Sequence, residues 1–409
     1  MSEQTAQPIP LTGRDLEVIT LIGFAHGISH FFHLLLPTLF PWLMAEFALG
    51  FTRIGVTMSV FFTVSALGQA GAGFLVDRFG ALRALFAGVV CFLLAAIALS
   101  LVDGYAGLLF VAVLAGLGNS VFHPADFTVL NRHVSSVRLG HAFSMHGLSG
   151  NLGWALAPLL MTGVATLAGW RMAALAAAGL ALLTLALLGW RRRTLRDPQT
   201  EASGAATTAD AGAPFAFLRT SAVWWCFAFF LLITTAFGGI QNFATPILQS
   251  LHGLSLAAGA ASLSAYLTGG AAGILVGGFL AQNGAHDRLI AMALTIAALL
   301  ALGLATLPLP PWLVPALMTG IGFCTGLAGP SRDLLVRRAA TSRFGQAAYG
   351  RVYGFVYSGL DTGLALAPLV FGGLMDQGRY AAVLIGIAVL QSLAILTALR
   401  VGGATRAAD

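Results

Sequence analysis

Three histidines at helical spacing stand in a segment that is otherwise apolar. His26, His30 and His33 lie within the run LIGFAHGISHFFHLLLPTLFPWL, which has almost no other polar residue. Their spacing of four and then three residues puts all three imidazoles on one face of an α-helix. Such a face could bind a metal ion, relay protons, contact a polar solute or simply pair with neighbouring carbonyl groups.

Other polar side chains also stand inside apolar runs, where an ionisable group is costly and therefore marks a functional candidate. These candidates are His123, Asp126, His146, Asn151, Gln241, Asn242, Arg332, Tyr357 and Asp361. We expect His123 and Asp126, three residues apart, to form a pair that exchanges a proton, unless Asp126 belongs to a structural ion pair with Arg332.

Two of these candidates have a specific expected role and a plain alternative. Arg332 offers a planar fork that suits a carboxylate or phosphonate, or it simply reaches toward the membrane surface. Asp361 is an isolated carboxyl that could carry a proton, or it could pack between two halves of the protein. Glycines at 269, 273 and 277 predict a close contact between two helices and need no ligand.

Patterns for metal binding by thiolates and for enzymatic catalysis are missing. Cys91, Cys226 and Cys324 are far apart, so neither a disulfide nor a thiolate metal site is expected. No cysteine, methionine or carboxylate pattern accompanies the three histidines, so we expect no metal site there, and transport of a metal ion or metal chelate is the second hypothesis. No nucleophile–base pattern and no phosphate-binding GxxxxGK[ST] occur, so neither an enzyme nor a cofactor is expected.

The composition is that of a membrane protein. Of 409 residues, 58% are hydrophobic and only 9% are charged, and the mean hydropathy is +0.87. A soluble domain carries about a quarter charged residues, so this chain cannot be water-soluble throughout. The distribution of the basic residues behind the net charge of +6 fits the positive-inside bias of a membrane protein and does not predict a nucleic-acid partner.

Apolar runs of about 20 residues recur along the chain, and each is long enough to cross a bilayer as a helix. We predict twelve spans near 17–43, 52–75, 82–102, 107–131, 139–165, 169–190, 219–247, 256–282, 287–306, 311–336, 346–374 and 379–400. All 21 basic residues are arginines, and with a cytoplasmic N-terminus only Arg53, Arg171 and Arg379 fall in outer loops. This asymmetry predicts that both termini are cytoplasmic.

The spans fall into two similar halves. Residues 191–215 are basic and then rich in Ala, Thr, Ser and Gly, which predicts a flexible cytoplasmic linker between residues 1–190 and 216–409. GNLGWALAPLL at 150–160 is echoed by LDTGLALAPLV at 360–370, and GFLVDRFG at 73–80 by GFLAQNGA at 278–285. Two six-helix halves with a substrate site between them are the plan of many secondary transporters.

The segment GAGFLVDRFGALRA resembles the signature between helices 2 and 3 of the major facilitator superfamily. Gly73, Asp77, Arg78, Gly80 and Arg83 match its pattern. The resemblance implies that these residues form a conformational latch and that helices 1, 4, 7 and 10 line a central cavity. We therefore expect an all-α membrane protein of twelve transmembrane helices in two pseudo-symmetric halves.

VFHPAD followed by HGLSGNLGWALAP also resembles the fosmidomycin resistance branch of that superfamily. Helix 4 has no arginine in its outer half, however, so typical multidrug efflux is not implied. The expected function is proton-coupled transport of a small polar or anionic organic solute or drug by alternating access. The expected partners are that solute, protons and membrane lipid, and the expected form is a monomer in the cell inner membrane.

Overall fold

The computed structural model describes residues 13–135, 138–195, 219–281, 286–344 and 349–406, with some helical side chains left out. Every regular element within these ranges is helical. The first half contains α1 (Gly13–His33), α2 (Phe40–Phe47), α3 (Phe51–Phe79), α4 (Ala81–Ser100), α5 (Tyr105–Ser120), α6 (Phe122–His133), α7 (Leu139–Ala168), α8 (Trp170–Trp190) and α9 (Arg192–Leu195). The second half contains α10 (Ser221–His252), α11 (Leu256–Leu280), α12 (His286–Thr306), α13 (Val314–Phe344), α14 (Tyr349–Asp376) and α15 (Tyr380–Arg406).

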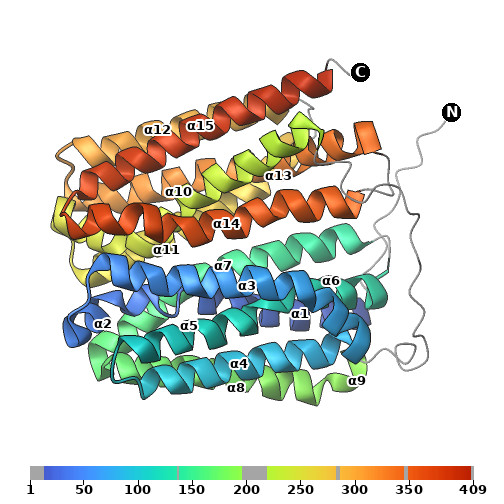
Figure 1. The fold of residues 1–409 in the computed structure, drawn as a ribbon, viewed down its shortest axis with the longest axis horizontal. Helices are drawn as coiled ribbons and strands as arrows, with labels where there is room; N and C mark the ends of the chain where they lie inside the picture. Colours follow the sequence, from blue (N-terminus) through green and yellow to red (C-terminus); the bar gives the residue numbers. More distant parts are fainter. Residues whose placement is uncertain (1–12, 136–137, 196–218, 282–285, 345–348, 407–409) are drawn as a thin grey trace.

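The predicted all-helical membrane fold is confirmed. Among the described residues, eleven spans are long and apolar enough to cross a membrane, and α1 with α2 adds a twelfth span that is bent by 42°. The two halves lie side by side as bundles of nearly parallel helices, with the first half drawn blue to green and the second yellow to red (Figure 1).

Two spans near the histidines are broken rather than straight. The predicted span 17–43 divides because α1 ends at His33 and a short 3-10 helix begins at Pro37. The predicted span 107–131 divides between α5 and α6 at Val121, three residues before Pro124. Proline has no backbone N–H and its ring crowds the preceding turn, so each break follows from the local sequence.

Glycines let helices touch within each half. A Cβ atom on Gly153 of α7 would overlap the carbonyl oxygen of Gly27 on α1, and one on Gly363 of α14 would lie 2.6 Å from the carbonyl oxygen of Leu231 on α10. Gly153 and Gly363 occupy corresponding positions in the two repeats, so the same close contact occurs twice.

The glycine stripe on α11 makes the contact that was predicted for it. Cβ atoms on Gly269, Gly273 and Gly277 would lie 2.1–2.4 Å from carbonyl oxygens of α13. Only a residue without a side chain fits at such a distance, so these glycines serve helix packing.

The halves meet through two helix pairs, α3 with α14 and α7 with α11, where the Ser264 hydroxyl donates to the carbonyl oxygen of Ala155 at 2.8 Å. The Asp376 carboxylate at the end of α14 accepts hydrogen bonds from the first backbone N–H groups of α3, including that of Thr52 at 2.9 Å. Further along, the Ser59 hydroxyl donates to the carbonyl oxygen of Ala365 at 2.7 Å. An acid at a helix N-terminus satisfies otherwise unpaired N–H groups, so Asp376 ties the second half to the first.

The beginning of the predicted linker is helical and docked. Arg191 pairs with Glu17 of α1 at 2.9 Å, and the Thr194 hydroxyl donates to the same carboxylate at 3.1 Å. Residues 196–218 lie outside the described part of the chain. The prediction of a flexible connection therefore concerns a segment that starts only after Leu195.

Candidate functional site

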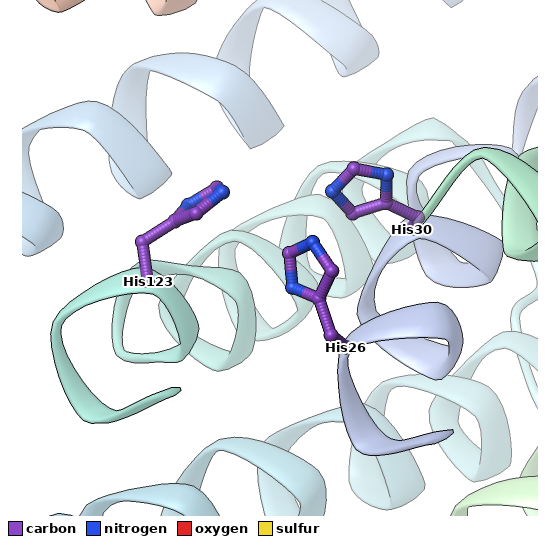
Figure 2. Close-up of side chains that lie close together, drawn as sticks. All are labelled: His26, His30 and His123. Atoms are coloured by element: carbon purple, nitrogen blue, oxygen red, sulfur yellow. The ribbon is translucent and has the colours of Figure 1, made fainter. Parts of the chain in front are cut away.

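The histidines of α1 lie on one buried face. The rings of His26 and His30 are 4.4 Å apart, and those of His30 and His33 are 4.9 Å apart. His123 of α6 lies across from His26 and His30, as Figure 2 shows. The ring of His146 from α7 stacks on that of His26 at 3.5 Å. Three helices thus bring five imidazoles together inside the first half.

Asp126 of α6 lies beneath this group and is fully buried, with 0% of its surface exposed. Its Oδ2 atom is 3.0 Å from Nε2 of His146 and 3.2 Å from Nδ1 of His26. Its other oxygen, Oδ1, has no hydrogen-bond partner among the described residues. The site therefore contains a carboxylate that two imidazoles from different helices contact.

The partner of Asp126 differs from the one that the sequence suggested. His123 was expected to pair with it from the same helix, but the structure places His146 and His26 at its carboxylate. His123 is turned toward α3 instead, and its Nδ1 atom is 3.2 Å from Oε1 of Gln69. Side chains three residues apart share a helix face, but the neighbouring helices decide which partner each one finds.

His33 is held by hydrogen bonds on both sides of its ring. Its Nε2 donates to Oδ1 of Asn119 at 2.9 Å, and its Nδ1 accepts from Nε1 of Trp154 at 3.2 Å. The Asn119 amide in turn donates to the Ser65 hydroxyl at 2.8 Å. Because an accepting Nδ1 cannot carry a proton, His33 is held as a neutral imidazole and acts as a structural element beside the site.

Replacing His33 with alanine should therefore destabilise the protein without affecting its coupling to protons. The change leaves the Asn119 carbonyl and the Trp154 N–H unpaired in a buried place, which costs about 1–3 kcal/mol. We expect a lower thermal unfolding temperature in detergent, measured by intrinsic fluorescence, and an unchanged pH dependence of transport. A changed pH dependence would show instead that His33 takes part in proton movement.

A polar chain leads from this cluster to the second half. Gln69 of α3 accepts from His123 through its carbonyl oxygen, and its Nε2 donates to Oδ2 of Asp361 on α14 at 3.4 Å. Asp361 was predicted either to carry a proton or to pack between the halves, and its carboxyl lies where α14 faces α3. The Gln69 amide therefore joins the titratable groups of the two halves.

Sequence reasoning did not single out Gln69, Asn119 or Trp154. Gln69 and Asn119 are uncharged polar residues in apolar runs, which is the signal that found Gln241 and Asn242. Trp154 was treated as part of the repeat only. Its ring lies 4.1 Å from that of His30, so it also covers the histidine face.

The other candidate residues lie on several helices. The Asn151 amide donates to the carbonyl oxygen of Gly147 one turn earlier at 2.9 Å. Gln241 and Asn242 are buried on α10, and the Gln241 Nε2 has no hydrogen-bond partner among the described residues. The Arg332 guanidinium on α13 lies over the ring of Phe230 at 4.6 Å. The Tyr357 side chain lies outside the described part of the chain.

The expected latch is described only in part. Gly80 has φ +88°, a backbone conformation that favours glycine, and it joins α3 directly to α4. Arg78 and Arg83 are exposed at this turn. The surroundings of Gly73 and Asp77 are not among the described parts of α3, so the latch itself stays a prediction.

A multi-pass bundle with two similar halves and a buried polar cluster is the architecture of a membrane transporter. The chain belongs to the Major Facilitator Superfamily, because residues 19–348 match the sequence profile of that family. It is therefore a transporter by family, and not an enzyme.

Three comparisons place the chain within this family. It is 32% identical over 143 residues to the fosmidomycin resistance protein of Escherichia coli (strain K12), a match that covers 35% of each chain. It is 26% identical over 387 residues to the uncharacterised MFS-type transporter YfnC of Bacillus subtilis (strain 168), covering 93% of this chain and 91% of that protein. The fold resembles a bacterial homologue of the human lysosomal transporter Spinster in its inward-facing, unoccupied conformation, with a TM-score of 0.75, 13% identity and 98% of both chains covered.

Proposed function

We propose that this protein is a proton-coupled secondary transporter that exports a small polar or anionic organic solute by alternating access. It would act as a monomer in the cell inner membrane, with both termini in the cytoplasm. Asp126, His123 and Asp361 are the proposed proton-carrying groups. The proposed solute contacts are His26, His30, His123, His146, Gln241, Asn242 and Arg332.

The observation that carries this proposal is the buried carboxylate of Asp126 between His26 and His146. Removing an ionised group from water costs several kcal/mol, so a buried carboxylate is more stable when its negative charge is neutralised. It can reach that state by gaining a proton, which an anionic solute cannot replace. Proton binding and solute binding at one such site are linked, which is what coupled transport requires.

The contact between the halves supports the link to conformational change. His123, Gln69 and Asp361 form a chain that passes from α6 through α3 to α14. Alternating access moves the two halves against each other. The hydrogen bond between Gln69 and Asp361 crosses from one half to the other, so this movement can break it and form it again. A change in the proton occupancy of Asp361 would then alter the strength of a contact between the halves.

The direction of transport is proposed from the relatives. One relative is named for resistance to the drug fosmidomycin, and another, 31% identical over 124 residues, is a probable 4-methylmuconolactone transporter of Cupriavidus pinatubonensis. Drug resistance is consistent with export, and export driven by an inward proton gradient is antiport.

The proposal is tested by solute flux under an imposed pH gradient. Purified protein is first screened for thermal stabilisation by fosmidomycin, other antibiotics and organic acids. Proteoliposomes are then loaded with the stabilising solute, and efflux is measured with and without an inward proton gradient. We expect the gradient to accelerate efflux and a protonophore to remove the acceleration. Flux that is the same in all three conditions would rule out proton coupling.

Replacing Gln69 with leucine should lower the transport rate, because it removes the hydrogen bonds that link the two halves. Leucine has a similar volume but cannot bond to His123 or Asp361. A hydrogen bond to a charged group contributes about 1.5–3 kcal/mol, so we expect transport to fall by at least about tenfold. Gln377→Leu, in the exposed turn after α14, is the matched control. Equal activity of the two variants would show that the hydrogen bonds of Gln69 to His123 and Asp361 play no part in transport.

A further inference from the structure

Three imidazoles from two helices converge on one point of the buried cluster. His26, His30 and His123 each offer a ring nitrogen, and these nitrogens all lie within 4.8 Å of one another. Figure 2 shows the rings of His123 and His30 extending toward each other, with His26 below and between them. The three rings pack against one another, but no hydrogen bond joins any two of them among the described residues, so their contact alone does not use the converging nitrogens.

The second ring nitrogens of two of these histidines lie near fixed polar groups. Nδ1 of His26 lies 3.2 Å from the Asp126 carboxylate without forming a hydrogen bond to it, and Nδ1 of His123 hydrogen-bonds to the Gln69 carbonyl oxygen at 3.2 Å. The bond to Gln69 keeps a proton on Nδ1 of His123 and leaves its Nε2 with a free lone pair, and the charge of Asp126 favours the same tautomer of His26. Histidines that bind metal ions are usually oriented in this way by a carboxylate or a carbonyl group.

The site also contains polar atoms that the described residues leave unsatisfied. Nδ1 of His26, Nδ1 of His30 and Oδ1 of Asp126 are buried without a hydrogen-bond partner among those residues. Buried polar atoms almost always have a partner, because each one without it costs about 1–3 kcal/mol. A cation beside these groups would balance the negative charge of Asp126.

We propose that His26, His30 and His123 form a binding site for a divalent transition-metal ion of the Zn²⁺ class, with Asp126 and Gln69 orienting two of the ligands. Imidazole nitrogen suits zinc, copper and nickel ions, and bonds of about 2.0–2.1 Å place ligand atoms about 3.3 Å apart. The ring nitrogens already lie within 4.8 Å of one another, so side-chain rotation alone would bring them to that separation. Three protein ligands leave one position open for water or for an oxygen of a solute.

The other two histidines of the cluster are distinguished from these ligands by their contacts. His33 uses one nitrogen to bond Asn119 and the other to accept from Trp154, so it has no lone pair for a metal ion. His146 directs its Nε2 to Asp126. The sequence offered no carboxylate near the α1 histidines, and α6 supplies it through the fold.

This inference rests on the proposed function, because the ion would share the buried histidine cluster with the transported solute. Metal binding is measured at equilibrium without a membrane gradient. A failed binding experiment would therefore leave the transport proposal intact, and a failed flux experiment would leave metal binding intact.

The test uses the full-length protein, purified in detergent with any affinity tag removed. Binding of Zn²⁺ is measured by titration calorimetry, and Co²⁺ is added as a visible-absorption probe of four-coordinate geometry. We expect one ion per chain. His26→Ala and His30→Ala should each weaken binding by at least about tenfold, and Gln69→Leu should weaken it by about 10-fold to 100-fold.

His252→Ala is the matched control, because His252 lies at the end of α10 and its Nε2 bonds to the Leu304 carbonyl oxygen. This variant should bind Zn²⁺ as the unchanged protein does. Thermal unfolding checks that each variant is folded, and His30→Gln replaces His30→Ala if the smaller side chain destabilises the protein. Absence of stoichiometric binding, or binding that His26→Ala and His30→Gln leave unchanged, would overturn the proposal.

Discussion

Replacing Asp126 with asparagine is expected to abolish proton-driven transport while the protein remains folded. Asparagine has nearly the same shape, and its carbonyl oxygen can still accept from His146. It cannot gain or lose a proton, so the buried cluster loses its only carboxyl group among the described residues. We expect transport driven by a pH gradient to fall by about 100-fold or more, the range for loss of a positioned proton acceptor.

Exchange measurements separate a coupling defect from general damage. Solute exchange across proteoliposomes at equal pH needs alternating access but no net proton movement, so it should be largely retained in Asp126→Asn. Asp103→Asn, in the exposed loop between α4 and α5, is the matched control and should behave as the unchanged protein. Gradient-driven transport at a normal rate in Asp126→Asn would remove Asp126 from the proposed mechanism.

Replacing Gly153 with alanine is expected to lower the stability of the protein more than any other Gly→Ala substitution on α7. The added Cβ would overlap the backbone carbonyl of Gly27, and backbone cannot turn aside as a side chain can. Forcing α1 and α7 apart would also displace His26 and His30 from His146. Overpacking of this kind costs about 1–3 kcal/mol, and a clash with backbone belongs at the upper end.

The matched control lies on the same helix. Gly163 of α7 has nothing within 4 Å of an added Cβ, so Gly163→Ala should be neutral or slightly stabilising, since alanine favours a helix by about 1 kcal/mol over glycine. Thermal unfolding of the two variants in the same detergent gives the comparison. Equal unfolding temperatures would show that the close contact of α1 with α7 is not needed for the fold.

The membrane fold followed from the sequence with few corrections. Apolar runs of membrane-spanning length are local properties, and the glycine stripe on α11 predicted its close contact with α13 correctly. The breaks after His33 and at Val121 were not predicted as ends of helices, although Pro37 and Pro124 mark both. A proline can bend, break or end a helix, and packing against neighbouring helices decides which of these occurs.

The sequence predicted which residues belong to the candidate site, but not which partners their side chains contact. His26, His30 and His33 share a face because helical spacing requires it. The difference between them, with His33 fully bonded and His30 partly unsatisfied, comes from Asn119 and Trp154 on two other helices. Local spacing carries no information about such partners, which lie 86 and 121 residues away in the chain.

The sequence by itself determined that this chain is a helical membrane protein with two related halves, that it belongs with the major facilitators, and that three imidazoles face one way. Hydrophobicity, helical period and repeated motifs act over short distances, so they can be read without a structure. Only the tertiary structure decided that Asp126 meets His26 and His146, and that Gln69 joins His123 to Asp361. Those contacts depend on how separate helices pack, and close approaches such as Gly153 against Gly27 set that packing.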